Sequence, residues 1–287
     1  MNAVTKLLCD LVAIPSINPA FAPGDKKLAG EEPVACHLIT LAKRLGLAIT
    51  RQPVLPGRRN LLVTLQGSGS IQRRILLAPH LDVVPADARQ FKPIIKNNRL
   101  YGRGACDTKS SVAVFFHSLC KLAEKKQRPK HTEIVFVGLV DEECNQSGSR
   151  AFSQSKLKAD LAIAGEPTML KVVTAHKGNL WLQLGTKGKA AHGAKPELGR
   201  NAINAMSRVV DLLGTQYAAR LKKRRHPLLG SPTINIGVIR GGNQPNVVPD
   251  RCTIDIDRRT IPGETDTSVR REMNALLRIH NLNVVTL

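Results

Sequence analysis

Several acidic residues and a histidine lie where they could together bind a metal ion. His80 and Asp82 are two residues apart and follow a short apolar run at 75–78. In an extended chain, residues two apart share a face, so Asp82 can hold one ring nitrogen of His80 and leave the other free for a metal. Asp107 lies at the head of an apolar helical segment. Considered singly, a His-x-Asp pair is more typical of a surface hydrogen bond, and Asp107 of a helix N-cap.

Further carboxylates follow two other apolar runs. Glu142 and Glu143 come after the run 132–140, and Glu166 comes after the run 160–165. Carboxylates gathered at one place repel one another unless cations neutralise them. Acidic surface turns could explain any one of these positions. A metal site explains the whole set better in a chain with a formal net charge of +21.

Strands alternate with helices through this part of the chain, which predicts a three-layer α/β domain. The run 132–140 is almost continuously apolar and is expected at the centre of a sheet covered on both faces. Ligands bind such sheets at the carboxyl ends of the strands, where these acids lie. The expected helices are 5–14, 31–45 and 107–126, and the expected strands are 48–54, 61–66, 74–79, a pair within 93–101, 132–140 and 160–165.

After about residue 176 the pattern changes to that of a smaller domain. Its expected order is β-α-β-β-α-β, the arrangement of a ferredoxin-like domain. We therefore predict a metal-binding domain at residues 1–175 and a ferredoxin-like domain at residues 176–287. The strands of the second domain are expected at 181–186, 234–240, 252–258 and 282–287, and its helices at 200–213 and 266–279.

The composition is that of a globular protein. A hydrophobic fraction of 42% in 287 residues is enough for one large core or two smaller ones. The sequence has no signal-peptide layout at its start and no apolar run long enough to cross a membrane. The six cysteines are scattered, with no Cys-x-x-Cys pair. We therefore expect reduced thiols in a cytoplasmic protein rather than disulfides or a cysteine zinc site.

The basic residues fall mostly in dispersed pairs, with one cluster at 222–226. A nucleic-acid-binding protein more typically gathers its basic residues in a stripe and interleaves aromatic residues, which are only 3% of this chain. We therefore expect a solvated basic surface that attracts anionic substrates, and no nucleic-acid partner. Binding through charge alone would instead show a steep dependence on salt.

The ordered motifs resemble those of the zinc-dependent metallopeptidases and amidohydrolases that include acetylornithine deacetylase, succinyl-diaminopimelate desuccinylase, aminoacylase and glutamate carboxypeptidase. The resemblance runs from Leu-Cys-Asp-Leu-Val-Ala-Ile-Pro-Ser-Ile-Asn-Pro at residues 8–19 to Asp-Arg-Arg-Thr-Ile-Pro-Gly at residues 257–263. It implies a three-layer α/β/α catalytic domain with an inserted ferredoxin-like dimerisation and lid domain, and hence a homodimer.

The resemblance also implies which residues bind two zinc ions, with Co²⁺ as a possible substitute. His80, oriented by Asp82, and Glu166 would bind the first zinc. Asp107 would bridge the two ions, and Glu143 would bind the second. Zinc accepts imidazole and carboxylate donors, lowers the pKa of bound water and polarises an amide carbonyl.

Four further roles follow from the same resemblance. Glu142 would be the general base that activates the water at the metals and passes its proton to the leaving amine. Because Glu142 and Glu143 are adjacent, their different roles require a turn or bulge that the sequence does not show. His192 would reach across a dimer to stabilise the oxyanion, and Asn246 and Arg259 would contact the substrate, with the arginine holding a carboxylate. Each of these three residues also has a structural explanation without a role in catalysis, as a histidine in a loop, an asparagine in a turn and an arginine on an edge strand.

The sequence departs from the family pattern at its end. In the family, the chain returns from the small domain to the catalytic domain and supplies a final histidine to the second zinc. This sequence stops at Leu287, and His280 lies in the connection before the last expected strand. The resemblance therefore implies that the C-terminal part of the catalytic domain is missing. The sequence is either a fragment or truncated product, or a natural short form with an incomplete second site.

Two functions are consistent with these features. The leading hypothesis is a hydrolase that cuts an amide bond in a small anionic N-acyl amino acid or peptide, of the acetylornithine deacetylase or succinyl-diaminopimelate desuccinylase type, in amino-acid biosynthesis. The motifs do not choose among the acyl groups. The alternative is a truncated, catalytically impaired homologue that dimerises or binds a single zinc ion.

Overall fold

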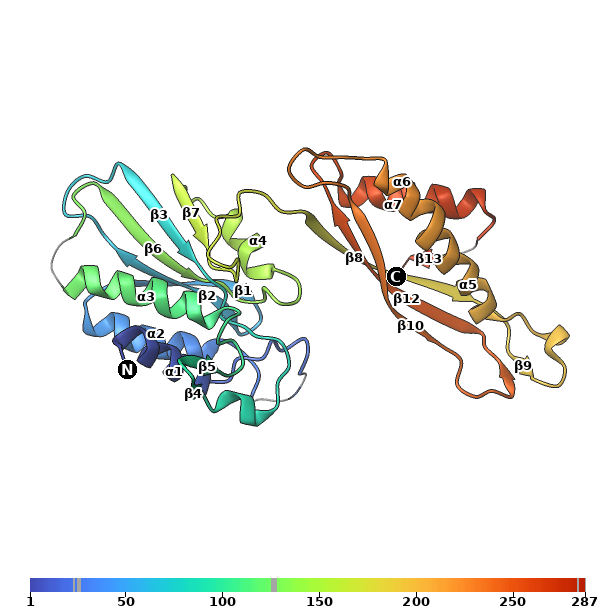
Figure 1. Cartoon of the computed structure of the whole chain (residues 1–287), viewed down its shortest axis with the longest axis horizontal. Coiled ribbons are helices and arrows are strands. Elements are labelled where there is room, and N and C mark those ends of the chain that lie inside the picture. Colours follow the sequence, from blue (N-terminus) through green and yellow to red (C-terminus); the bar gives the residue numbers. More distant parts are fainter. Residues whose placement is uncertain (23, 25–26, 125–127, 283, 287) are drawn as a thin grey trace. The chain divides into compact units, whose positions relative to one another are not determined.

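The computed structural model describes residues 1–22, 24, 27–124, 128–282 and 284–286. The chain forms two compact units, Met1–Lys171 and Val172–Leu287, each considered by itself below (Figure 1). No helix among these described residues is long and apolar enough to cross a membrane.

The first unit is built on a five-stranded mixed sheet in the order β1-β2-β6-β3-β7. β1 (Ala48–Leu55) and β2 (Arg58–Leu65) pair in antiparallel fashion, and β2 pairs in the same way with β6 (Thr132–Gly138). β3 (Arg73–Ala78) runs parallel to β6 on one side and to β7 (Leu161–Ala164) on the other. The apolar strand β6 is therefore central, as its composition predicts, although its ladder ends at residue 138 rather than 140.

Helices cover both faces of this sheet, so the predicted three layers are present (Figure 1). On one face, α1 (Ala3–Ala13), α2 (Glu32–Arg44) and α3 (Lys109–Glu124) enclose the larger core, which includes an edge-to-face contact between Phe116 and Phe136 with ring centroids 5.3 Å apart. On the other face, α4 (Ser147–Ser153) contributes Phe152, which packs on Val135 and Val137. Successive residues of β6 alternate between the two cores, as the pleat requires. The part of the predicted third helix beyond residue 124 lies outside the described residues.

The second unit has an antiparallel sheet in the order β10-β12-β8-β13. Its helices α5 and α7 pack on one face of this sheet through residues spaced three or four apart, such as Met206 and Val209 on α5. The element order is the β-α-β-β-α-β of the predicted ferredoxin-like fold. The bounds are β8 (Gly178–Lys187), α5 (Ala202–Leu212), β10 (Thr233–Gly241), β12 (Arg251–Thr260), α7 (Asp266–Ile279) and β13 (Val285–Thr286).

Some element bounds differ from the prediction in this unit. The helix expected to end at residue 213 continues through a π-helical turn, Leu213–Tyr217, into α6 (Ala218–Lys222). Leu213, Tyr217 and Leu221 extend its buried stripe every four residues, and this burial outweighs the exposed glycine at position 214.

Three short strands also differ from the prediction. β9 (Ala191–His192) and β11 (Val247–Val248) form a small ladder inside two predicted loops, too short for a periodic signal. The strand expected at 282–287 pairs only at Val285–Thr286, while residues 283 and 287 lie outside the described part. The predicted strand pair within 93–101 is present as β4 (Ile94–Lys96) and β5 (Arg99–Tyr101).

Candidate metal centre

The predicted metal ligands of the first unit come from four separate segments that meet at one edge of its sheet. The parallel strands β3, β6 and β7 end together there, and His80 pairs with Leu139 in a bridge just beyond the strands. Glu142 and Glu143 follow the end of β6, and Glu166 follows β7 by two residues. The parallel register therefore gathers side chains that lie far apart in the sequence.

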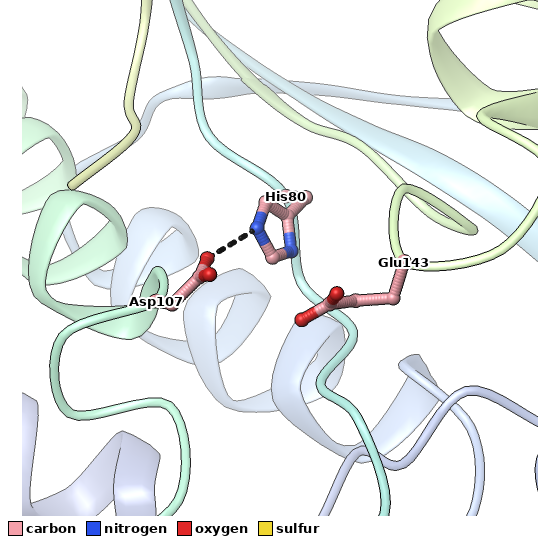
Figure 2. A group of neighbouring side chains, drawn as sticks. All are labelled: His80, Asp107 and Glu143. Atoms are coloured by element: carbon pink, nitrogen blue, oxygen red, sulfur yellow. Dashed lines mark hydrogen bonds and ion pairs between the residues drawn. The ribbon is translucent and has the colours of Figure 1, made fainter. Parts of the chain in front are cut away.

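His80 lies at the centre of this group. Its Nε2 is 3.1 Å from Asp107 Oδ1, 3.8 Å from Glu166 Oε1 and 3.9 Å from Glu142 Oε2. Ligand atoms of His80, Asp107 and Glu143 all lie within 4.8 Å of one another, and Figure 2 shows the three side chains together. The side chain of His80 is 1% exposed, whereas those of Asp107 and Glu166 are 53% and 43% exposed. The group therefore opens to solvent on its carboxylate side.

The other ring nitrogen of His80 is held by Asp82, mainly through the backbone carbonyl oxygen rather than the carboxylate. Nδ1 lies 3.0 Å from the backbone carbonyl oxygen of Asp82 and 3.7 Å from its carboxylate. A carbonyl oxygen only accepts, so Nδ1 carries the hydrogen. In neutral His80, the lone pair of Nε2 then faces the cluster. This tautomer is the form of histidine that can bind a metal through Nε2.

The carboxylate of Asp82 instead holds the main chain of the two glutamates. It accepts hydrogen bonds from the backbone N–H of Glu142 at 3.1 Å and of Glu143 at 3.0 Å. It also accepts one from Asn18 Nδ2 at 2.7 Å. Asn18 belongs to the N-terminal motif but was not predicted as a site residue, because nothing local in the sequence indicates that it reaches residues more than sixty positions away.

The charges at the cluster favour bound protons in the absence of a cation. Burial opposes the charge of His80, but its hydrogen bonds with Asp107 and Asp82 prevail and raise its pKa to about 11. Burial, together with the neighbouring carboxylates and against the effect of His80, raises the pKa of Glu143 and of Glu166 to about 7 each. A divalent cation could replace these protons. One imidazole nitrogen and several carboxylate oxygens form a donor set that zinc accepts, so the residues fit such an ion.

The required turn between β6 and the glutamates is present. Asp141, directly before Glu142, has a φ of +64°, in the left-handed region that aspartate tolerates better than most residues. The chain therefore leaves the strand direction abruptly just before Glu142 and Glu143, and both glutamates reach the cluster around His80.

The remaining predicted residues lie in the second unit. His192 in β9 pairs with Val247, and the N–H of Gly193 donates to the carbonyl oxygen of Asn246 at 2.7 Å, so His192 and Asn246 are neighbours. Arg259 lies near the C-terminal end of β12, whereas Asn246 lies before its start. The Nε of Arg259 donates to Asp257 at 3.0 Å. Their roles toward a substrate stay predictions.

Both units of the chain have relatives among known proteins. Residues 60–190 match Peptidase family M28, and residues 174–285 match the Peptidase dimerisation domain. The acetylornithine deacetylase of Vibrio cholerae serotype O1 is 34% identical over 262 residues, which cover 88% of this chain and 67% of that protein. The acetylornithine deacetylase of Salmonella arizonae is 34% identical over 280 residues, which cover 93% and 69%. The chain thus spans about two thirds of the length of these relatives.

Solved structures share the fold. An M20 family metallo-carboxypeptidase from Sulfolobus solfataricus has a TM-score of 0.76 at 18% identity, covering 100% of this chain and 78% of that chain. A tripeptidase from Staphylococcus aureus has a TM-score of 0.71 at 23% identity, covering 99% and 74%. The sequence relatives show that the chain belongs to the M20/M28 family of zinc peptidases and amidohydrolases, a family of hydrolases.

Proposed function

We propose that the protein hydrolyses an amide bond in a small anionic N-acyl amino acid or peptide, with zinc bound at the cluster around His80. The observation that carries this proposal is the convergence of one buried imidazole and several carboxylates at the carboxyl edge of a parallel set of strands. The acetylornithine deacetylases among the relatives support an N-acyl amino acid as the substrate.

His80, Asp107 and Glu143 would take part in holding the metal ions, since their ligand atoms lie within 4.8 Å of one another. Glu166, with an oxygen 3.8 Å from His80 Nε2, would complete the site of His80. The proposal includes two zinc ions, with Co²⁺ as a substitute. Asp107 would serve both ions, and Glu143 would serve the second. When bound, zinc polarises the amide carbonyl and lowers the pKa of water.

Glu142 is proposed as the general base. Its carboxylate faces the cluster and its side chain is 34% exposed, so water can reach it. Burial raises the pKa of Glu142, and the charges of Asp82 and Asp107 add to this rise against the effect of His80. A carboxylate with a raised pKa is a stronger base near neutral pH. Glu142 can therefore take a proton from water and deliver it to the leaving amine nitrogen.

His192, Asn246 and Arg259 are proposed to act on the substrate from the second unit. His192 would stabilise the oxyanion from across a homodimer, and Arg259 would hold a substrate carboxylate. The match to the Peptidase dimerisation domain supports the dimer. The proposal keeps amino-acid biosynthesis in the cytoplasm as the setting of this reaction.

The test is hydrolysis of N-acetylornithine and N-succinyl-diaminopimelate by the purified protein. Turnover of one of them that is lost after chelation and restored by added zinc is the expected result. Zinc bound without turnover of any N-acyl amino acid or dipeptide would contradict the proposal, and would favour an impaired homologue that only binds metal.

A further inference from the structure

A buried aspartate at the turn before the two glutamates is held by residues from three other segments. Asp141 is fully buried, and its Oδ1 accepts hydrogen bonds from Arg58 Nη1 and Asn18 Nδ2, both at 3.0 Å. Its Oδ2 accepts a hydrogen bond from the hydroxyl of Ser147 at the start of α4. These contacts stabilise a left-handed backbone conformation that is unfavourable for most residues other than glycine.

Arg58 ties this aspartate to the start of α2. Its guanidinium forms a forked ion pair with the buried carboxylate of Glu31, with 3.0 Å between Nε and Oε2. The same Glu31 accepts a hydrogen bond from the backbone N–H of Asp141 at 3.1 Å. Arg58 and Glu31 therefore hold both the side chain and the main chain of Asp141. A planar guanidinium suits this arrangement because it can bind two carboxylates at fixed angles.

Three consecutive backbone N–H groups at the turn donate to carboxylates. That of Asp141 donates to Glu31, and those of Glu142 and Glu143 donate to the two oxygens of Asp82. Asn18 joins the two halves, because its amide donates to both Asp82 and Asp141. The main chain of the turn is thus fixed from behind, which leaves the side chains of Glu142 and Glu143 free to face the cluster.

We propose that Asp141 and Arg58 are positioning residues that hold the turn from which Glu142 and Glu143 reach the cluster. Among the described residues, neither side chain forms a hydrogen bond with His80, Asp107 or Glu166. They act by holding a strained turn, so that one glutamate can serve as a metal ligand and its neighbour as a base. The consequence for catalysis rests on the proposed function, whereas the effect on the turn does not.

The matched variants are Asp141→Gly and Asp141→Asn. Glycine accepts the positive φ without strain but removes the carboxylate, whereas asparagine tolerates the same conformation and keeps an acceptor for Arg58. Arg58→Lys is a third variant, which keeps the charge but cannot bridge Glu31 and Asp141. Arg51→Gln is the control, because it breaks an ion pair with the half-exposed Glu32, and among the described residues neither side chain forms a hydrogen bond with the turn.

The first measurement is hydrogen–deuterium exchange of the metal-free proteins over residues 139–146. In Asp141→Gly and Arg58→Lys, exchange at 141–143 should be at least about tenfold faster than in the wild type, with β6 unchanged. The apparent zinc affinity should fall about 10- to 100-fold, the usual effect of losing an outer partner of a metal ligand. Asp141→Asn should come closer to the wild type in both measurements, and Arg51→Gln should match it.

Unchanged exchange at 141–143 in both Asp141→Gly and Arg58→Lys would overturn the inference. So would a wild-type zinc affinity in variants whose turn exchanges faster. A wild-type protein that binds no zinc would refute the proposed function, while the exchange rates of the metal-free proteins would still decide whether Asp141 and Arg58 position the turn.

Discussion

Protons and metal compete for His80 and the glutamates around it. Burial opposes the charge of His80, yet its hydrogen bonds with Asp107 and Asp82 raise its pKa to about 11, and burial with nearby carboxylates raises that of Glu166 to about 7. These protons occupy ligand atoms, so metal binding must release them. Zinc must displace the proton of His80 at any pH below about 11 and those of the glutamates below about 7. The apparent zinc affinity should therefore increase between about pH 5.5 and 8, by about tenfold per unit for each proton displaced, and more steeply below about pH 7 than above it.

Competition with a chromophoric chelator at a series of pH values measures this dependence. Glu166→Gln removes a carboxylate ligand, so the zinc affinity of this variant should be lower than that of the wild type. It also removes a group whose proton zinc must displace, so the affinity should depend less steeply on pH. An affinity that does not change over this range would mean that zinc binds elsewhere.

Glu142 and Glu143 are adjacent, and their proposed roles can be separated by substitution. Glu142→Gln keeps the size of the side chain and removes the base, so hydrolysis should fall by about 10²- to 10⁴-fold while the zinc content stays that of the wild type. Glu143→Gln should instead lose zinc. The two variants are compared by elemental analysis and turnover in the same preparations. Equal turnover in Glu142→Gln and the wild type would remove Glu142 from the role of base.

The residues of the cluster were largely predictable from sequence, whereas their detailed contacts were not. Apolar runs that end in acids indicate strands that deliver carboxylates to one edge, and this reasoning locates Glu142 and Glu166. It fails for Asp82, whose carboxylate holds backbone N–H groups sixty residues away rather than chiefly the imidazole. It also misses Asp141. The sequence does not indicate that Arg58, 83 positions away, is its hydrogen-bond partner, because the two meet only in the folded sheet.

The packing of α4 against the end of β6 depends on a glycine. A Cβ at Gly148 would lie 2.3 Å from the carbonyl oxygen of Val140 and 2.7 Å from Asn60 Oδ1. Both neighbours are fixed, since Asn60 also bonds the N–H of Val140. Gly148→Ala should therefore destabilise the protein by about 1–3 kcal/mol, as overpacking does.

The matched control for this prediction is Gly214→Ala. No heavy atom lies within 4 Å of a Cβ at this helical position, so alanine should be neutral or stabilise the protein by up to about 1 kcal/mol. Urea unfolding measures both variants. A Gly148→Ala protein as stable as the wild type would show that α4 can move away from β6 without cost.

Most helices and strands could be predicted from the periodicity of apolar residues in the sequence. The elements that were missed or misjudged have physical explanations. The long helices and the central strand β6 carry strong apolar patterns, and α7 has its predicted bounds. The short α4 consists mostly of residues that are small or polar, and it is stabilised by contacts with the sheet rather than by its own pattern. The helical segment continues past α5 because Tyr217 and Leu221 are buried. The glycine at position 214, considered locally, would instead predict that the helix ends there.

The whole molecule is expected to be a homodimer. Residues 174–285 match the Peptidase dimerisation domain, and the sheet of this unit has β10 at one edge, where Val238 and Ile239 are exposed. Sedimentation equilibrium should give twice the chain mass of 31.2 kDa. The isolated fragment 172–287, if it folds, should also dimerise. A monomer of the full chain at micromolar concentrations would rule out the dimer, and with it the role proposed for His192.

Zinc content of the purified chain tests metal binding at the cluster most directly. Elemental analysis is done on dialysed wild type, on His80→Ala and on His176→Ala, since His176 is an exposed histidine of the second unit. One to two zinc ions per chain are expected in the wild type and in His176→Ala, with zinc lost from His80→Ala. A wild type without zinc, or a His80→Ala protein that keeps all of it, would contradict the assignment of this cluster as the metal centre.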